Sequence, residues 1–118
     1  MTLYEAIFWL ISLHFVADFQ LQSDFISRGK SPGSSAIWPI VLSAHAAIHG
    51  VMVAIIVGPV LGLAEFILHW LVDLGKSSGV FGRGVGGFYF DQALHLVSKF
   101  VWIGLAMSGV PTGMGLFG

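Results

Sequence analysis

Nearly all the histidines and aspartates of this chain lie inside strongly apolar segments, and this placement constrains the fold more than any other feature of the sequence. All five histidines and three of the four aspartates form pairs four residues apart: His14/Asp18, His45/His49, His69/Asp73 and Asp91/His95. Residues i and i+4 lie one above the other on one face of an α-helix. The pattern therefore predicts four helices, each with a single narrow polar edge on an otherwise apolar surface.

The composition of the chain is that of a membrane protein. Apolar residues make up 56% of the 118 residues and charged residues 9%, whereas soluble domains carry about 25% charged residues. A hydrocarbon core about 30 Å thick needs about 20 residues of helix. We predict four transmembrane helices, over residues 2–22, 37–57, 60–76 and 88–107, of which the third is short for a bilayer.

The fold class predicted from these spans is all-α, a four-helix transmembrane bundle with up-down topology. Residues 1–108 would form this single domain and residues 109–118 a loose C-terminal tail. Glycine, proline and polar residues mark the predicted connections. These are a loop over residues 23–35, a tight turn at Gly58-Pro59 and a glycine-rich loop over residues 76–87.

The basic residues predict how the bundle lies in the membrane. Arg28 and Lys30 are in the first loop, Lys76 and Arg83 in the third, and the termini and central turn carry none. Because basic loops stay on the cytoplasmic side, we predict a multi-pass protein of the bacterial inner membrane with both termini outside the cytoplasm. Five scattered basic residues exclude a nucleic-acid partner. The expected partners are the lipid bilayer, a lipid-like substrate and an oligomeric or larger membrane assembly.

The four polar edges are predicted to meet in the cytoplasmic half of the bundle and to bind metal. A carboxylate facing lipid costs several kcal/mol, so such groups turn inward, and the up-down topology brings the pairs to one depth. The chain has no cysteine, and carboxylate and imidazole ligands suit Zn, Mn, Fe or Ni. We therefore predict a cofactor of one or two divalent metal ions. The predicted ligands are His14, Asp18, His69, Asp73, Asp91 and His95.

Three further residues are candidates for catalysis. With the ligands assigned as above, His45, His49 or Glu65 would be free to act as a general base. Glu65 could equally form an ion pair with Lys99, and we leave that choice open. Any single histidine–aspartate pair could also be no more than a hydrogen bond that locks two helical turns. Four such pairs at one depth favour a shared site instead.

Two lysines and three aromatic residues lie near the ends of the predicted spans. Lys30 and Lys76 either bind a phosphate or only mark the cytoplasmic side of the membrane. Trp38, Trp102 and Tyr89 lie near the ends of the predicted spans. Tryptophan and tyrosine are enriched where a membrane protein meets the lipid headgroups. We therefore expect these three residues to be interfacial anchors.

The motifs occur in a characteristic order along the chain. They are His14-Phe15-Val16-Ala17-Asp18-Phe19-Gln20-Leu21-Gln22, Lys30, His45-x-x-x-His49, His69-x-x-x-Asp73-x-x-Lys76 and Asp91-Gln92-Ala93-Leu94-His95. This order resembles a small integral membrane family of bacteria and phages that is known only as a domain of unknown function. The resemblance covers roughly residues 10–100 and implies the four-helix topology, with the eight paired residues as signature positions. A looser likeness to inner-membrane metal-dependent hydrolases is analogy alone.

The predicted site is compatible with several functions, of which we favour hydrolysis. A metal-dependent hydrolase would act on a lipid-like or phosphorylated substrate that enters from the cytoplasmic side. The alternatives are a non-enzymatic, metal-stabilised membrane subunit or phage effector, an ion or proton conduit or metal carrier, and a haem protein. The outer halves of the helices carry few polar residues, which counts against a conduit. Three aspartates would fit a buried porphyrin poorly.

Overall fold

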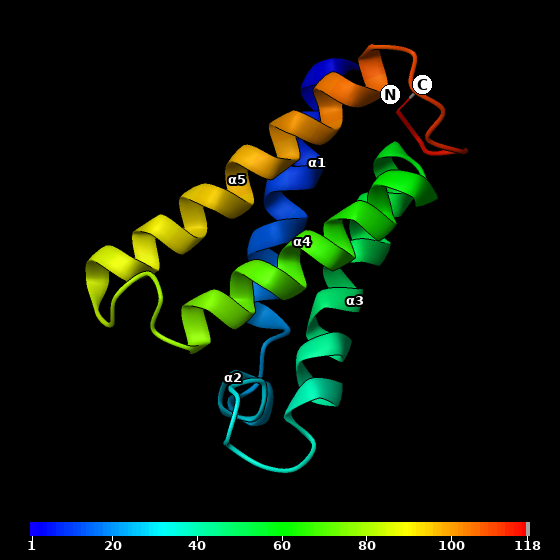
Figure 1. Ribbon diagram of the computed structural model, residues 1–118. Coiled ribbons are helices and arrows are strands. Elements are labelled where there is room, and N and C mark those ends of the chain that lie inside the picture. The colour runs from blue at the N-terminus through cyan, green and yellow to red at the C-terminus, as the bar shows by residue number, and fades with distance from the viewer. Residues whose placement is uncertain (118) are drawn as a thin grey trace.

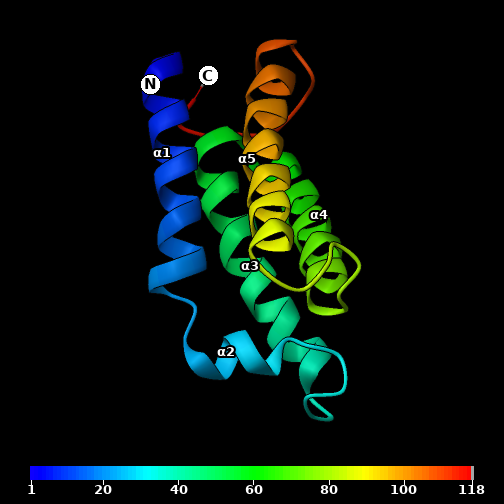
Figure 2. The same ribbon diagram turned by 90° about the vertical axis from the view of Figure 1, so that its left-hand side faces the viewer.

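The computed structural model describes residues 1–117, and every element of secondary structure within that range is a helix. Four long helices run up and down the molecule: α1 (Leu3–Phe15), α3 (Trp38–Val57), α4 (Pro59–Ser77) and α5 (Val85–Met107) (Figure 1). A π-helical turn, η1 (Val16–Gln20), continues α1, and the short helix α2 (Asp24–Gly29) lies across one end of the bundle (Figure 2). The predicted all-α class is confirmed.

The two basic loops lie at the same end of the bundle. Helix α1 begins and α5 ends at one end, whereas α2 and the connection between α4 and α5 are at the other (Figures 1 and 2). The long helices therefore alternate in direction, as the predicted up-down topology requires.

Local sequence signals set the ends of the helices. Thr2 and Glu5 form a capping box at the start of α1, because the Thr2 hydroxyl accepts from the Glu5 amide at 3.2 Å and the Glu5 carboxylate accepts from the Thr2 amide at 2.7 Å. Pro39 and Pro59 lie in the first turns of α3 and α4, where a backbone amide is not needed. Gly58, with φ of 107°, allows the sharp turn between these helices.

The first connection contains a helix that the sequence analysis missed. Residues 23–35 were predicted to be a loop, but Ser23 caps α2 by accepting a hydrogen bond from the Ile26 amide at 3.3 Å. The helix is only six residues long, too short for a periodic apolar pattern to reveal it.

The C-terminal segment, predicted to be loose, folds back over the turn between α3 and α4. The amides of Leu116 and Phe117 donate to the carbonyls of Ile55 and Ile56 at 2.9 and 2.8 Å. The last carbonyls of a helix have no partner within that helix. The tail supplies donors to these carbonyls at the end of α3.

The interior of the bundle has an apolar half and a polar half. An apolar core that includes Leu10, Val57 and Ile103 fills the end where α1 begins. Histidines, carboxylates and a glutamine fill the other half. Many large apolar side chains instead cover the outside, among them Tyr4, Phe8, Ile40, Val51, Leu63, Ile67, Val97 and Phe100.

The hydropathy of the helices supports one membrane span where we predicted four. Among the described helices, α3 alone is both long and apolar enough to cross a bilayer, with a mean hydropathy of 2.2. Helices α4 and α5 carry the buried ionisable residues, which lower their hydropathy, and α1 stops after 13 residues at the π-helical turn. The prediction of four long helices is confirmed. The prediction that they cross a membrane is supported by hydropathy for α3 alone among the described helices.

Candidate functional site

The eight paired residues come together in one buried group, which we call the histidine–aspartate cluster. Each has at most 6% of its surface exposed. The cluster comprises His14 and Asp18 from α1 and η1, His45 and His49 from α3, His69 and Asp73 from α4, and Asp91 and His95 from α5. All four predicted polar edges therefore meet inside the bundle.

Asp18 occupies the centre of this cluster. Its Oδ1 lies 3.1 Å from His49 Nε2, 3.2 Å from His45 Nε2 and 3.8 Å from His69 Nε2. Asp18 belongs to the π-helical turn, in which the amide of Leu21 donates to the carbonyl of Val16 at 2.9 Å. Such turns are rare, occur mostly as single turns within α-helices and are frequent at functional sites.

Asp73 faces the same imidazoles from α4. Its Oδ2 lies 3.2 Å from His45 Nε2 and 3.3 Å from His69 Nε2, and its Oδ1 lies 3.1 Å from His95 Nε2. His95 Nε2 is also 3.3 Å from Asp91 Oδ1. His45, which we predicted to be a catalytic group, thus faces the same two aspartates as the predicted ligand His69.

Several cluster atoms lie close together without forming hydrogen bonds. His45 Nε2, His69 Nε2 and Asp91 Oδ1 are fully buried and have no hydrogen-bond partner. Buried polar atoms almost always have one. Ligand atoms about 2.1 Å from a shared ion are about 3.0–3.4 Å from each other at the usual coordination angles. The distances of 3.1–3.3 Å between the oxygens of Asp18 and Asp73 and the nearest imidazole nitrogens fall in this range, so these side chains could hold a common cation.

Three sets of side chains could hold a metal ion, with the ligand atoms of each set within 4.8 Å of one another. The sets are Asp18, His45, His49 and His69; Asp18, Asp91 and His95; and Glu65, His69 and His95. Asp18 belongs to the first two sets, so its carboxylate could serve both.

Glu65 forms the ion pair that the sequence left open. Its Oε1 accepts from Lys99 Nζ at 2.6 Å and from His69 Nδ1 at 3.3 Å. Its Oε2 accepts from Trp102 Nε1 at 2.6 Å. Trp102 is therefore buried inside the bundle, and our expectation that it anchors the protein at a membrane interface is wrong. The indole N–H pairs with a buried carboxylate oxygen in place of water.

The buried carboxylates of the cluster outnumber their cationic partners. Apart from the ion pair just described, Lys30 Nζ lies 3.0 Å from Asp73 Oδ2. Neither Asp18 nor Asp91 contacts a lysine or arginine within residues 1–117. A buried carboxylate needs a cation or strong donors in place of water. The cluster is thus short of positive charge by about two units, which a divalent ion or two imidazolium groups would supply.

Gln92 is a site residue that the sequence analysis did not assign. Its Nε2 donates to Asp18 Oδ2 at 2.8 Å and to Asp91 Oδ2 at 3.3 Å, and its Oε1 accepts from His14 Nε2 at 3.0 Å. The two carboxylates fix the orientation of the amide, because only its nitrogen can donate to them. His14 Nε2 is therefore held as a donor to Gln92, and His14 Nδ1 has no partner.

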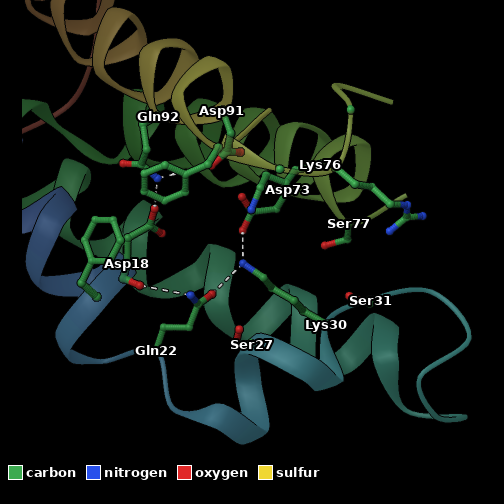
Figure 3. Close-up of a pocket in the computed structure, with 15 residues that line it drawn as sticks. Asp18, Gln22, Ser27, Lys30, Ser31, Asp73, Lys76, Ser77, Asp91 and Gln92 are labelled. Carbon is green, nitrogen blue, oxygen red and sulfur yellow. Dashed lines mark hydrogen bonds and ion pairs between the residues drawn. The ribbon is translucent and has the colours of Figure 1, made fainter. Parts of the chain in front are cut away.

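A cavity of about 350 Å³ opens onto the cluster at the end of the bundle where the basic loops lie (Figure 3). Asp18, Asp73, Asp91 and Gln92 line its inner part. Lys30, which follows α2, reaches across it, and its Nζ donates to Asp73 Oδ2 at 3.0 Å and to Gln22 Oε1 at 2.6 Å. The cluster is thus accessible from one side.

Comparison with known proteins identifies the family of the chain but no activity. A family model described as "Protein of unknown function (DUF3307)" matches residues 6–110, a range that includes the whole cluster and the residues lining the cavity. No curated protein and no solved structure matches the chain.

Proposed function

The chain belongs to this DUF3307 family, and from the site itself we propose that it is an intramembrane metal-dependent hydrolase whose histidine–aspartate cluster holds one or two divalent ions. Zn, Mn, Fe and Ni all suit imidazole and carboxylate ligands. A divalent ion bound there would lower the pKa of a coordinated water toward neutrality and polarise a phosphoryl or acyl oxygen.

The metal proposal depends most on which ring nitrogen of His69 carries the proton. Its Nδ1 lies 3.3 Å from a Glu65 oxygen that also accepts from Lys99, so Nδ1 carries the proton. In neutral His69 the lone pair of Nε2 then points at Asp73 Oδ2, 3.3 Å away, with no donor between them. A cation between these two atoms turns the repulsion into coordination. Metal-binding histidines commonly donate their other ring nitrogen to a carboxylate, which fixes the orientation of the imidazole.

The structure leads us to revise the roles of four site residues, three of them in the cluster. His45 and His49 lie within about 3.2 Å of Asp18 Oδ1, as ligands of the same ion would, so we now propose them as ligands. Glu65 is saturated by its donors, so we propose that it positions His69 and does not act as a base. His14, whose Nε2 donates to Gln92, is left with Nδ1 as the ring nitrogen that takes up or releases a proton.

The surface of the molecule supports a membrane location. Large apolar side chains such as Tyr4 (82% exposed) and Ile40 (70% exposed) cover the outside, while all five histidines and four of the six carboxylates are buried. Soluble monomers rarely expose continuous apolar patches of more than a few hundred square ångströms. We therefore propose a multi-pass protein of the bacterial inner membrane. Arg28, Lys30, Lys76 and Arg83 would place the cavity on the cytoplasmic side and both termini outside the cytoplasm.

The apolar half of the bundle argues against a conduit. Leu10, Val53, Val57 and Leu61 pack together between the cluster and the end where α1 begins. An ion crossing this layer would lose its hydration without gaining ligands, which is costly. The cavity reaches the cluster from the opposite end, as an enzyme needs for substrate to enter and product to leave.

We expect removal of metal to slow hydrolysis strongly. The purified full-length chain in detergent would be assayed with p-nitrophenyl phosphate and p-nitrophenyl butyrate, before and after treatment with EDTA. Chelation should lower turnover by about tenfold or more, and Zn²⁺ or Mn²⁺ should restore it. Turnover that survives complete loss of metal would contradict the proposal. Metal binding without turnover of either ester would favour a non-enzymatic, metal-stabilised subunit.

A further inference from the structure

The cavity above the cluster has an acidic inner part and a basic mouth. The inner part carries Asp18, Asp73 and Asp91, which are buried. The mouth carries Lys30 and Lys76, which are half-buried, and Arg83, which is exposed. The inner part attracts cations and the mouth attracts anions. A metal ion would bind to the acidic inner part. An anionic group could then lie between this ion and the three basic side chains of the mouth.

We propose that the substrate is a phosphorylated amphiphile whose phosphate ester is bound by Lys30, Lys76 and Arg83. This inference rests on the proposed hydrolase function and specifies its substrate class. Hydrolysis would form a bond from the water oxygen to phosphorus and break the ester bond to the amphiphile, whose oxygen takes up a proton. The products are inorganic phosphate and an alcohol, so no oxidant or second substrate is needed.

The three basic residues are held at the mouth by different contacts. Lys30 Nζ is fixed by Gln22 and Asp73. Lys76 Nζ lies 5.8 Å from the centre of the Phe88 ring, at the distance of a cation–π contact. The Arg83 guanidinium covers Gly79, where an added Cβ would come within 2.9 Å of it. Because Gly79 has no side chain, there is room for the Arg83 guanidinium to lie over it.

The remaining polar groups of the mouth favour phosphate over a simple carboxylate. Three hydroxyl groups, those of Ser27, Ser31 and Ser77, line the cavity together with the basic side chains. A phosphate monoester carries up to two negative charges and several acceptor oxygens, whereas a carboxylate has one charge and two oxygens. An arginine fork and several further donors suit the larger acceptor set.

An aromatic strip beside the cavity points to an amphiphile over a free phosphate ion. Phe19 and Phe88 line the cavity with their ring centres 6.2 Å apart, and Phe15 stacks on Phe19 at 6.0 Å. All three rings are exposed on the outside of α1, η1 and α5. The cavity of about 350 Å³ is near the lower limit for small-molecule sites. It would hold a headgroup while an apolar chain lies along the three rings.

Binding of phosphonates, whose carbon–phosphorus bond is not hydrolysed, tests the substrate class. Isothermal titration calorimetry would compare hexylphosphonic acid, methylphosphonic acid and hexanol on the full-length, metal-loaded chain in detergent. We expect hexylphosphonic acid to bind about tenfold or more tightly than methylphosphonic acid, and hexanol not to bind measurably. Equal binding of the two phosphonates would overturn the amphiphile and indicate a site for free phosphate.

Variants of the mouth test its residues. The double variant Lys76→Gln/Arg83→Gln should weaken hexylphosphonic acid binding by about tenfold or more, while Arg28→Gln, outside the cavity, should leave it unchanged. If the double variant does not fold, Arg83→Gln alone, at an exposed side chain, should still weaken binding severalfold. Binding at wild-type affinity would overturn the inference. Metal analysis of the same samples separates the two failures, because a metal-loaded chain that binds no phosphonate contradicts the substrate class alone.

Discussion

Replacing Asp18 by asparagine is expected to remove the metal from the purified protein and to lower turnover by about a hundredfold or more. Asp18 Oδ1 lies within 3.2 Å of both histidines of α3, and the residue belongs to two of the three sets of side chains that could hold an ion. Asparagine keeps the shape of the side chain but loses the negative charge, and its amino group cannot bind a cation. The cluster would then lose the carboxylate that two of the three possible ligand sets share.

Asp24→Asn is the matched control for this substitution. Asp24 is the one aspartate outside the cluster, and it is exposed in the first turn of α2. We expect the control to keep its metal and its activity. Elemental analysis gives the metal content of both variants, and circular dichroism shows that their helices are intact. An Asp18→Asn protein that folds and retains a full complement of metal would contradict the central role of this carboxylate.

Replacing Lys99 by methionine is expected to destabilise the fold by about 3–5 kcal/mol, because it leaves a buried carboxylate without its cation. Lys99 and Glu65 are both buried, and their charged atoms lie 2.6 Å apart. Methionine fills a similar volume, so the loss is electrostatic and not one of packing. Thermal unfolding in detergent measures the change in stability.

The double variant Lys99→Met/Glu65→Gln distinguishes the charge effect from damage to the core. Removing both charges should recover most of the lost stability, since glutamine can still accept from Trp102 through its one carbonyl oxygen. If the double variant were no more stable than Lys99→Met, the buried charge would not be the cause. The same variant should bind metal more weakly, because a neutral amide orients His69 less firmly than a carboxylate does.

Helical periodicity was enough to predict which ionisable residues meet. His14, His49, His69 and His95 come from four helices, yet their spacing to a second polar residue placed each of them on the face that turns inward. The physical reason is that an ionisable group cannot remain on the apolar side of such a helix without a large cost. The up-down order then brought the four faces to one level.

Periodicity could not predict residues that reach the site from elsewhere on a helix. Gln92 is next to Asp91 in sequence, so it leaves α5 about 100° around the axis, off the polar edge. It reaches Asp18 only because its side chain is long. Lys30 contacts Asp73 from 43 residues away through α2, a helix without an apolar period. Such contacts depend on tertiary packing and not on local spacing.

Two details of the site depend on backbone geometry and neighbouring side chains, which the sequence does not show. The π-helical turn around Asp18 interrupts what we predicted as one continuous span. The sequence could not predict this turn, because a change from i+4 to i+5 hydrogen bonding does not alter the apolar pattern of the segment. The burial of Trp102 depends on a neighbouring side chain. A tryptophan near the end of an apolar helix suits an interface, but the nearby carboxylate of Glu65 offers its indole a buried partner.

X-ray absorption at the metal edge of the purified wild-type protein tests most directly whether the histidine–aspartate cluster binds a cation. We expect a transition metal at one or two ions per chain, surrounded by nitrogen and oxygen atoms only, with the outer scattering shells of several imidazole rings. A folded protein that shows no metal edge, or a metal without imidazole neighbours, would contradict a metal centre at this cluster.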